Sequence, residues 1–362
     1  MRWFVRPSVS AAASASVVPL DAMRRAALRV VVRHPRWSDV VLRRDLRIAT
    51  LGVLHAAFAF VLAVYCPVLL LVLGPVLLGV VHVASDVRYL VVRRQVSVGV
   101  QRLAWGACGV LVLLRVVAPM GLASAVGRAE WVVATAWVVS AAALGGASGG
   151  GARLRSAGAV LLALALGTAS ILHPDTARLV FVQAHNVVAL LLWFFLFRRN
   201  RRAVAVPLAL TAALAVWLCS GRLYALTLHH GQATAFGVHV LAAADWLVPT
   251  VERADLAVGL TCAFVFLQSV HYAVWLLYVP QDDQRFEATP SFRASVRGLV
   301  RDFGPAWLAA IALAAVVVLA LAAASPVKTR HTYLSLATFH GYLELALFAH
   351  LFARGRLPRD AR

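Results

Sequence analysis

Two histidines in this chain are each followed by a carboxylate four residues later, in the segments His82-Val-Ala-Ser-Asp86 and His340-Gly-Tyr-Leu-Glu344. On an α-helix this spacing places both side chains on one face, about one turn apart. A carboxylate so placed can accept the proton of one ring nitrogen and leave the other nitrogen to bind a metal ion. The spacing leaves open whether each carboxylate meets its own histidine or one on a neighbouring helix.

Two further histidines, His185 and His271, lie in other apolar stretches of the chain. Four separate segments therefore each carry one histidine, a number that suits one iron, copper or zinc ion or a close pair of ions. The predicted metal ligands are His82, His185, His271 and His340. Four neutral imidazoles bring no charge, so Asp86 and Glu344 are expected to balance the charge of the ion or to orient its ligands.

Other polar residues in the apolar stretches are expected to have supporting or structural roles. Asn186 and Gln268 are predicted to hydrogen-bond oxygen or water at the site. A lone histidine in an apolar helix is often a hydrogen-bonding partner for a neighbouring helix, and His55, which has no polar neighbour in the sequence, fits that role. The sequence assigns no role to three histidines that lie between two apolar stretches: His229, His230 and His239.

The helices that position these side chains are predicted to cross a membrane. Of the 362 residues, 62% are hydrophobic and 14% are charged, whereas a soluble domain has roughly 25% charged residues and under half apolar residues. Apolar runs of about the 20 residues that a bilayer requires follow one another closely. They predict an all-α, polytopic membrane helix bundle with about ten spans, over residues 47–65, 68–92, 99–120, 129–147, 154–172, 179–197, 203–219, 254–278, 303–324 and 332–353.

The net charge of the chain is +20, from 35 basic and 15 acidic side chains. The arginines concentrate in alternate connections between the predicted spans, including the loop 285–301, and by the positive-inside rule this distribution predicts that both termini are cytoplasmic. The expected location is the cell membrane, a bacterial inner membrane. Around the bundle over 47–353, residues 1–46 then form a basic interfacial segment on anionic lipid, residues 221–253 an outer-side loop or re-entrant segment, and residues 354–362 a basic cytoplasmic tail.

Several kinds of protein are disfavoured by what the sequence lacks. No polar stretch is long enough to carry the arginines on a folded nucleic-acid-binding surface, so no nucleic-acid partner is expected. The four cysteines include no C-x-x-C pair, which argues against a thiolate zinc site or a disulfide oxidoreductase. The H-x-x-x-H and H-x-x-H-H boxes of membrane desaturases do not occur in the sequence either.

The order of the histidine motifs resembles that of the Brp/Blh family, bacterial and archaeal membrane proteins that cleave β-carotene to retinal. The motif at His82 resembles the family's first H-x-x-x-D signature, and the motif at His340 resembles its last, with Glu344 in place of aspartate. His185 and His271 would take the middle positions. This resemblance implies an iron-dependent oxygenase built from transmembrane helices, with a carotenoid as its substrate.

Two functions fit the residues themselves. The first is a membrane metalloenzyme, a non-haem iron oxygenase or related oxidoreductase, whose lipophilic substrate enters from the bilayer. Fe(II) is its expected cofactor, and copper or zinc would also suit the histidines. The second is a proton- or metal-coupled transporter that uses the same His/Asp/Glu cluster as a relay. A helical scaffold in which the polar residues only join helices is a third interpretation.

Overall fold

The computed structural model describes residues 17–94, 96–120, 123–147, 150–197, 201–284 and 289–355. Nearly all of these residues are helical, which confirms the predicted all-α fold. Within this part of the chain, ten helices are long and apolar enough to cross a membrane, which is the number predicted. They cover Arg44–Tyr65, Pro67–Val92, Val98–Met120, Ala125–Gly146, Gly151–Leu172, Pro174–Phe197, Arg202–Cys219, Ala254–Asp282, Pro305–Ala324 and Pro326–Arg354.

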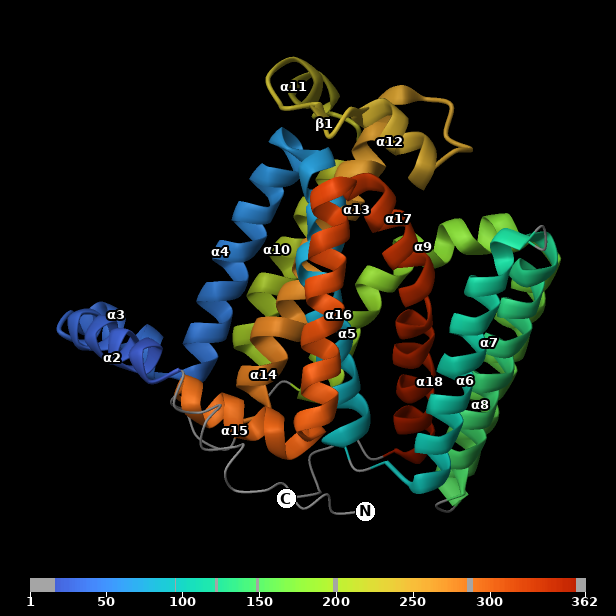
Figure 1. The fold of residues 1–362 in the computed structure, drawn as a ribbon, viewed down its shortest axis with the longest axis horizontal. Coiled ribbons are helices and arrows are strands. Elements are labelled where there is room, and N and C mark those ends of the chain that lie inside the picture. The colour runs from blue at the N-terminus through green and yellow to red at the C-terminus, as the bar shows by residue number, and fades with distance from the viewer. Residues whose placement is uncertain are drawn as a thin grey trace.

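The long helices stand side by side in one bundle (Figure 1). Their bounds are α4 (Arg44–Tyr65), α5 (Pro67–Asp86), α6 (Val98–Val117), α7 (Ala123–Gly146), α8 (Gly150–Leu172), α9 (Pro174–Leu192), α10 (Arg201–Cys219), α13 (Ala254–Ala273), α16 (Pro305–Ala324), α17 (Pro326–Ala337) and α18 (Phe339–Arg354). Helix α13 is the most deeply buried of them and packs against α4, α5, α9, α10 and α12 (Val240–Leu247). The centre of the bundle therefore lies along α13.

Two predicted spans begin later than the helices that contain them. Helices α7 and α17 start at Ala123 and Pro326, six residues before the predicted starts at 129 and 332. Hydropathy misses the first turns of α17 because they carry two basic residues, although a proline suits the first turn of a helix. The predicted span 332–353 lies within the helical stretch Pro326–Arg354, which a single turn residue, Thr338, divides into α17, ending at Ala337, and α18, beginning at Phe339.

In Figure 1, α2 and α3 project to the left beside the lower end of α4, α15 lies below them under the bundle, and α11, α12 and a small hairpin lie at the upper end. Their bounds are α2 (Val18–Val32), α3 (Pro35–Leu42), α11 (Tyr224–His229), β1 (Thr234–Ala235), β2 (Val238–His239) and α15 (Phe292–Phe303). The structure describes all of 221–253 and has no eleventh span there. The loop predicted over 285–301 instead contains most of α15, because its arginines fall on the polar face of an amphipathic helix.

The basic N-terminal helix α2 is tied to α15. Both oxygens of Asp21 accept hydrogen bonds from the first amides of α15, at 2.7 Å from Phe292 N and 3.2 Å from Arg293 N. A carboxylate at this position satisfies free N–H groups and complements the helix dipole. Arg24 adds a hydrogen bond of 2.6 Å to the carbonyl oxygen of Thr289. Residues 1–16 of the predicted interfacial segment and 356–362 of the predicted tail lie outside the described residues.

A proline inside α5 is compensated by an arginine from α17. Pro75 has no N–H group, so the carbonyl of Leu71, four residues earlier, loses its usual helical donor. Nε of Arg330 donates to that carbonyl at 2.8 Å, and Arg330 is only 3% exposed. The buried arginine therefore joins α17 to α5 at the point where the proline interrupts the helix.

Three of the long helices continue into a π-helical turn, a form in which one extra residue is accommodated within the helix and which is frequent at functional sites. The turns are η1 after α5 (Val87–Val92), η3 after α9 (Trp193–Phe197) and η4 after α13 (Val274–Tyr278). They contribute the large buried side chains of one core cluster: Tyr89, Trp193, Phe197, Trp275 and Tyr278. The parts of α5 and α13 that precede the π turns contribute to a second core cluster. Val72 of α5 and Val270 of α13 belong to this second cluster.

Candidate metal centre

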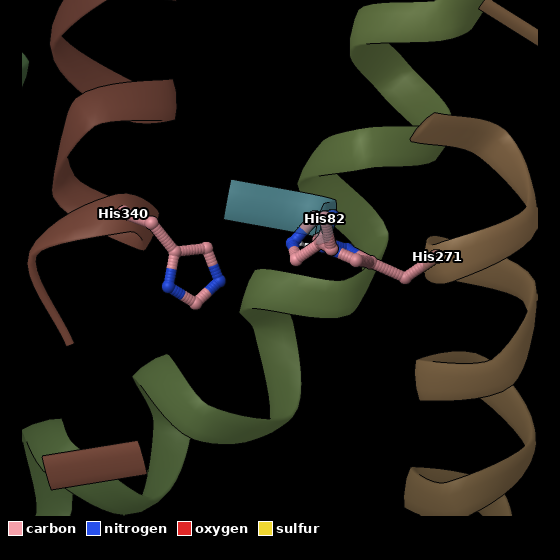
Figure 2. Close-up of side chains that lie close together, drawn as sticks. All are labelled: His82, His271 and His340. Atoms are coloured by element: carbon pink, nitrogen blue, oxygen red, sulfur yellow. Dashed lines mark hydrogen bonds between the residues drawn. The ribbon is translucent and has the colours of Figure 1, made fainter. Parts of the chain in front are cut away.

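The four predicted histidines converge between the two core clusters. His82 extends from α5, His185 from α9, His271 from α13 and His340 from α18. Figure 2 shows the imidazoles of His82, His271 and His340 pointing toward one another from three helices. The side chains of His82 and His271 are 1% exposed and that of His185 is 15% exposed. The expectation that separate helices deliver these histidines to one place is thus met in the geometry.

The four rings form a closed square. Neighbouring ring centroids lie 4.6 Å apart for His82 and His271, 4.6 Å for His271 and His185, 4.7 Å for His185 and His340, and 5.1 Å for His340 and His82. The diagonal from His271 to His340 is 6.4 Å. An ion about 2.1 Å from each ring nitrogen would lie about 3.2 Å from each centroid, which gives about 4.6 Å between neighbouring rings and about 6.5 Å across the square. The ring spacing matches such a centre, but the ring nitrogens that lie within 4.8 Å of one another belong to His82, His271 and His340, whereas His185 and His271 group with Glu344.

Two opposite sides of this square bring ring nitrogens to 3.0 Å. Nε2 of His82 faces Nε2 of His271, and Nε2 of His185 faces Nε2 of His340, each at that distance. Two ring nitrogens 3.0 Å apart can share one proton in a hydrogen bond. They can also bind the same ion, because two ligand atoms that are each about 2.1 Å from an ion, with a right angle between the two bonds, are about 3.0 Å apart.

The break between α17 and α18 orients His340. Its Nδ1 donates to the carbonyl oxygen of Ala337 at 2.5 Å, so its Nε2 carries the lone pair that faces His185. A hydrogen bond from the second ring nitrogen to a carbonyl is the usual support of a metal-bound histidine. The next residue, Gly341, lets α18 approach α9, because a Cβ atom there would lie 2.7 Å from Phe181 and 3.0 Å from Nδ1 of His185.

A second contact holds α5 against α13. Oγ of Ser85 donates to the carbonyl oxygen of Trp275 at 2.7 Å, and Trp275 belongs to the π turn η4. Ser85 follows His82 by three residues and Trp275 follows His271 by four, so the bond lies about one helical turn beyond each histidine. It therefore fixes the two helices close to where their histidines meet.

The two carboxylates behave differently, which answers the question left open by their spacing. Asp86 meets its own histidine, with Oδ2 3.4 Å from Nε2 of His82. Glu344 turns away from His340 and lies between two other helices, with Oε2 3.6 Å from Nδ1 of His185 and Oε1 3.8 Å from Nε2 of His271. Both carboxylates are fully buried.

Among the described residues no oxygen of either carboxylate has a partner with full hydrogen-bond geometry, although the Trp275 side chain lies within reach of Glu344 as a donor. Among the described residues, Asp86 and Glu344 form ion-pair contacts with histidines and with no lysine or arginine. An unpaired buried carboxylate costs several kcal/mol, and a cation removes that cost. One oxygen of each carboxylate and one nitrogen of His82 lie within 4.8 Å of one another. This donor set of imidazole and carboxylate groups fits a divalent metal ion.

A cavity of about 310 Å³ adjoins the histidines. Its wall includes His185, His271 and His340 together with Asn186 and Gln268, so the two amides predicted to contact oxygen or water face the same space. Asn186 is 2% exposed and its Nδ2 has no partner within the described chain, which leaves this donor available to a molecule in the cavity. Much of the remaining wall is aromatic: Trp131, Phe181, Phe264, Tyr272 and Tyr342.

Several residues of the cavity were not singled out from the sequence. Glu130 is 4% exposed, forms an ion pair with Arg115 and accepts a hydrogen bond of 3.2 Å from the hydroxyl group of Tyr342. The available signal was its place as the second residue of the predicted span 129–147, a carboxylate in an apolar run. Tyr272, whose ring centroid lies 5.1 Å from that of His82, follows His271 directly and gave no periodic signal.

Outside the cluster lie the four histidines to which the sequence assigned a structural role or no role: His55, His229, His230 and His239. Nε2 of His55 donates to the carbonyl oxygen of Ser269 at 3.1 Å, which joins α4 to α13. Nδ1 of His239 accepts a hydrogen bond from Leu241 N at 3.3 Å and caps α12. His229 and His230 are exposed at the end of α11. These positions are consistent with structural roles.

Comparison with known proteins adds no relative. No protein-family model, no curated protein and no solved structure matches the chain. The resemblance to the Brp/Blh family therefore stays a prediction, and the function has to follow from the chemistry of the site.

Proposed function

We propose that this protein is a membrane-embedded metalloenzyme, a non-haem iron oxygenase or related oxidoreductase that acts on a lipophilic substrate. The observation that carries the proposal is the square of four histidines with two buried carboxylates, whose ion-pair contacts among the described residues are to these histidines. Histidine and carboxylate ligands suit Fe(II), and imidazole also suits copper and zinc. His82, His185, His271 and His340 would bind the metal, and Asp86 and Glu344 would balance its charge.

We also propose that the helix bundle lies in a membrane, and the exposed apolar side chains of the helices support this location. Helix α16 is strongly apolar yet has no buried residue, and Leu313 and Val316 are 64% and 60% exposed. Such a surface is unfavourable in water and favourable against lipid. The arginine distribution supports cytoplasmic termini, and the proposed location is a bacterial inner membrane. Arg25 and Arg29 are exposed on α2 and would meet anionic lipid.

The cavity beside the histidines supports the choice of substrate. Its aromatic wall would exclude water and accept an apolar molecule from the bilayer. Iron with open coordination positions would supply activation of dioxygen. The protein's own contribution is to hold the substrate next to the histidines and to offer the amides of Asn186 and Gln268 as hydrogen-bonding groups. A carotenoid is the substrate that the resemblance to the Brp/Blh family suggests.

A proton- or metal-coupled transporter is the second candidate, favoured by one feature of the same cavity. The cavity is lined both by the histidines and by the ion pair of Arg115 and Glu130, so charged groups are present beyond the histidines themselves. A chain of titratable groups of this kind is typical of proton and ion pathways in membranes.

Metal content distinguishes the two candidates. Iron is quantified in protein purified in detergent for the wild type, His82→Ala, His340→Ala and, as a control, His55→Ala, which replaces a histidine outside the cluster. We expect near-stoichiometric iron in the wild type and in His55→Ala and its loss in the other two variants. Protein without bound metal that supports ion-dependent flux in liposomes would refute the enzyme and favour the transporter.

The narrower substrate proposal has its own test. The protein is expressed in a host that makes β-carotene, with the His82→Ala variant as the control, and retinal is assayed. Retinal with the wild type alone would support a carotenoid as the substrate. Unchanged carotenoid at good expression would remove the carotenoid as substrate and would leave the metal centre to the first experiment.

A further inference from the structure

The cavity beside the histidines carries an excess of positive charge. Arg115 and Arg178 both line it, whereas Glu130 is the carboxylate of its wall. Glu130 already pairs with Arg115 and accepts the hydroxyl proton of Tyr342. With the histidines neutral, and with Asp86 and Glu344 assigned to the metal centre, Arg115, Arg178 and Glu130 leave one positive charge at their end of the cavity. A positive charge beside an apolar cavity is stabilised by an anion.

Arg115 also has unused hydrogen-bonding capacity. Its side chain is 17% exposed, and its buried Nε has no partner among the described residues. Arg178 is an exposed residue in the first turns of α9 and extends toward α7, where its Nη2 would lie 3.6 Å from a Cβ atom placed at Gly127. The two arginines thus come from different helices to one wall of the cavity.

One face of α9 connects this charge to the histidines. Arg178, Phe181, Val182 and His185 all line the cavity, at the spacing of three, four and seven residues that marks a single helix face. Seven residues correspond to a rise of about 10 Å along the helix. The ring of Phe181 stacks on that of Tyr342 at 4.5 Å between centroids, so the wall between the two ends is aromatic.

We propose that the ligand of this cavity is a single-chain lipid with a carboxylate head group, which pairs with Arg178 and the free side of Arg115 and extends its chain along α9 to the histidines. The proposal rests on the proposed function and names a substrate class different from the carotenoid that the resemblance to the Brp/Blh family suggests. A cavity of about 310 Å³ suits one acyl chain rather than the two chains of a phospholipid. The distance of about 10 Å places a carbon about eight bonds from the carboxylate beside the histidines.

This ligand differs in one respect from a pure hydrocarbon. A hydrocarbon would fill the aromatic part of the cavity and leave the positive charge without a counter-ion. A carboxylate makes charge-assisted hydrogen bonds with guanidinium groups, which are about twice as strong as neutral ones. The expected order of affinity is therefore fatty acid above its methyl ester.

Binding of oleate and of methyl oleate tests the proposal. The protein is placed in nanodiscs of neutral phosphatidylcholine, treated with a chelator, and titrated with each radiolabelled probe. We expect saturable oleate binding that is about tenfold tighter than that of methyl oleate, and a loss of about tenfold for oleate in Arg178→Gln. Arg178→Lys should recover part of the affinity, and Arg222→Gln, which changes an exposed arginine outside the cavity, should bind as the wild type does.

Three results would overturn the proposal: equal binding of the two probes, unchanged oleate binding in Arg178→Gln, or displacement of oleate by phosphatidylglycerol added to the disc. The last result would mean that the arginines bind a phospholipid head group. Because the titration uses chelator-treated protein and no turnover, its outcome is independent of the metal. Failure to find metal would therefore refute the proposed function without deciding this binding experiment.

Discussion

Nδ1 of His340 donates to the carbonyl oxygen of Ala337 across the break between α17 and α18, at 2.5 Å. This bond fixes both the tautomer and the direction of the ring, because the proton on Nδ1 leaves the lone pair on Nε2. A second histidine of the same helix makes a similar bond, from Nδ1 of His350 to the carbonyl oxygen of Ala141 at 3.0 Å. Both histidines donate from Nδ1 to a carbonyl oxygen. They differ at Nε2, which faces Nε2 of His185 in the case of His340 and has no partner among the described residues in the case of His350.

This comparison predicts different consequences of removing each ring. His350→Ala should reduce the free energy of unfolding by about 1 kcal/mol, through its lost hydrogen bond, and leave the metal content unchanged. His340→Ala should remove the metal. Metal analysis and thermal unfolding of both variants provide the measurement. Loss of metal in His350→Ala to the same extent would contradict the assignment of the centre to the four-histidine square.

The substitution Glu344→Gln should reduce metal-dependent stability. The variant keeps the shape of the side chain and removes the charge, so metal affinity should fall about 10- to 100-fold. That loss lowers the stabilisation by saturating metal by about 1.4 to 2.7 kcal/mol. Without metal the variant should be at least as stable as the wild type, because no charge is buried. Unfolding with and without metal measures both effects, and Glu252→Gln, at an exposed position, is the control.

Arg330→Met should destabilise the bundle by about 1 to 3 kcal/mol, because the carbonyl of Leu71 would be left without a donor. In a Pro75→Ala background the helix regains an amide for that carbonyl, so the same substitution should cost less. A double-mutant cycle from unfolding in detergent gives the coupling energy between the two positions. Simple additivity of the two substitutions would show that the arginine does not replace the missing amide.

The Asp302 carboxylate should make stability depend on pH in the acidic range. Burial alone would raise its pKa, but hydrogen bonds from Nε of Arg88 at 2.8 Å and from Nε of Arg93 at 2.9 Å lower the pKa overall. A group whose pKa is lowered in the folded protein stabilises it above the unfolded pKa of about 3.9 and loses this contribution as pH falls through the folded pKa. Asp302→Asn should therefore be less stable than the wild type at pH 7.

The difference between Asp302→Asn and the wild type should shrink as pH falls below about 4, where the wild-type carboxyl group also becomes neutral. Unfolding midpoints at a series of pH values measure this convergence. A constant difference across the series would mean that the ion pairs with Arg88 and Arg93 do not contribute to stability.

The membrane-length helices could be predicted from the sequence because a bilayer requires apolar runs of about 20 residues, and such runs are recognised directly in the sequence. The sequence was insufficient for α15, whose basic residues suggested a loop. The arginines there fall on one side of an amphipathic helix, and Asp21, more than 270 residues earlier, satisfies its first amides. No local pattern contains that partner.

The sequence predicted which residues form the candidate site but not which of them contact one another. The spacing of four residues left open which histidine each carboxylate meets, and in the structure Asp86 meets its own histidine, His82. For Glu344 the contacts are to His185 and His271, because the side chain leaves its own helix and enters the space between α9 and α13. Glu130 was missed since its partners, Arg115 and Tyr342, come from α6 and α18.

The π turns η1, η3 and η4 have a consequence for any change in chain length. Each turn lies a few residues beyond a histidine of the square. Deleting one residue from such a turn would give a more regular α-helix and would also rotate one half of the span by about 100° relative to the other. The histidine and the aromatic side chains of the π turn could then no longer both face the interior of the bundle. The extra residue therefore sets the rotation between the two halves of the span, so that both halves present the correct side chains to the core.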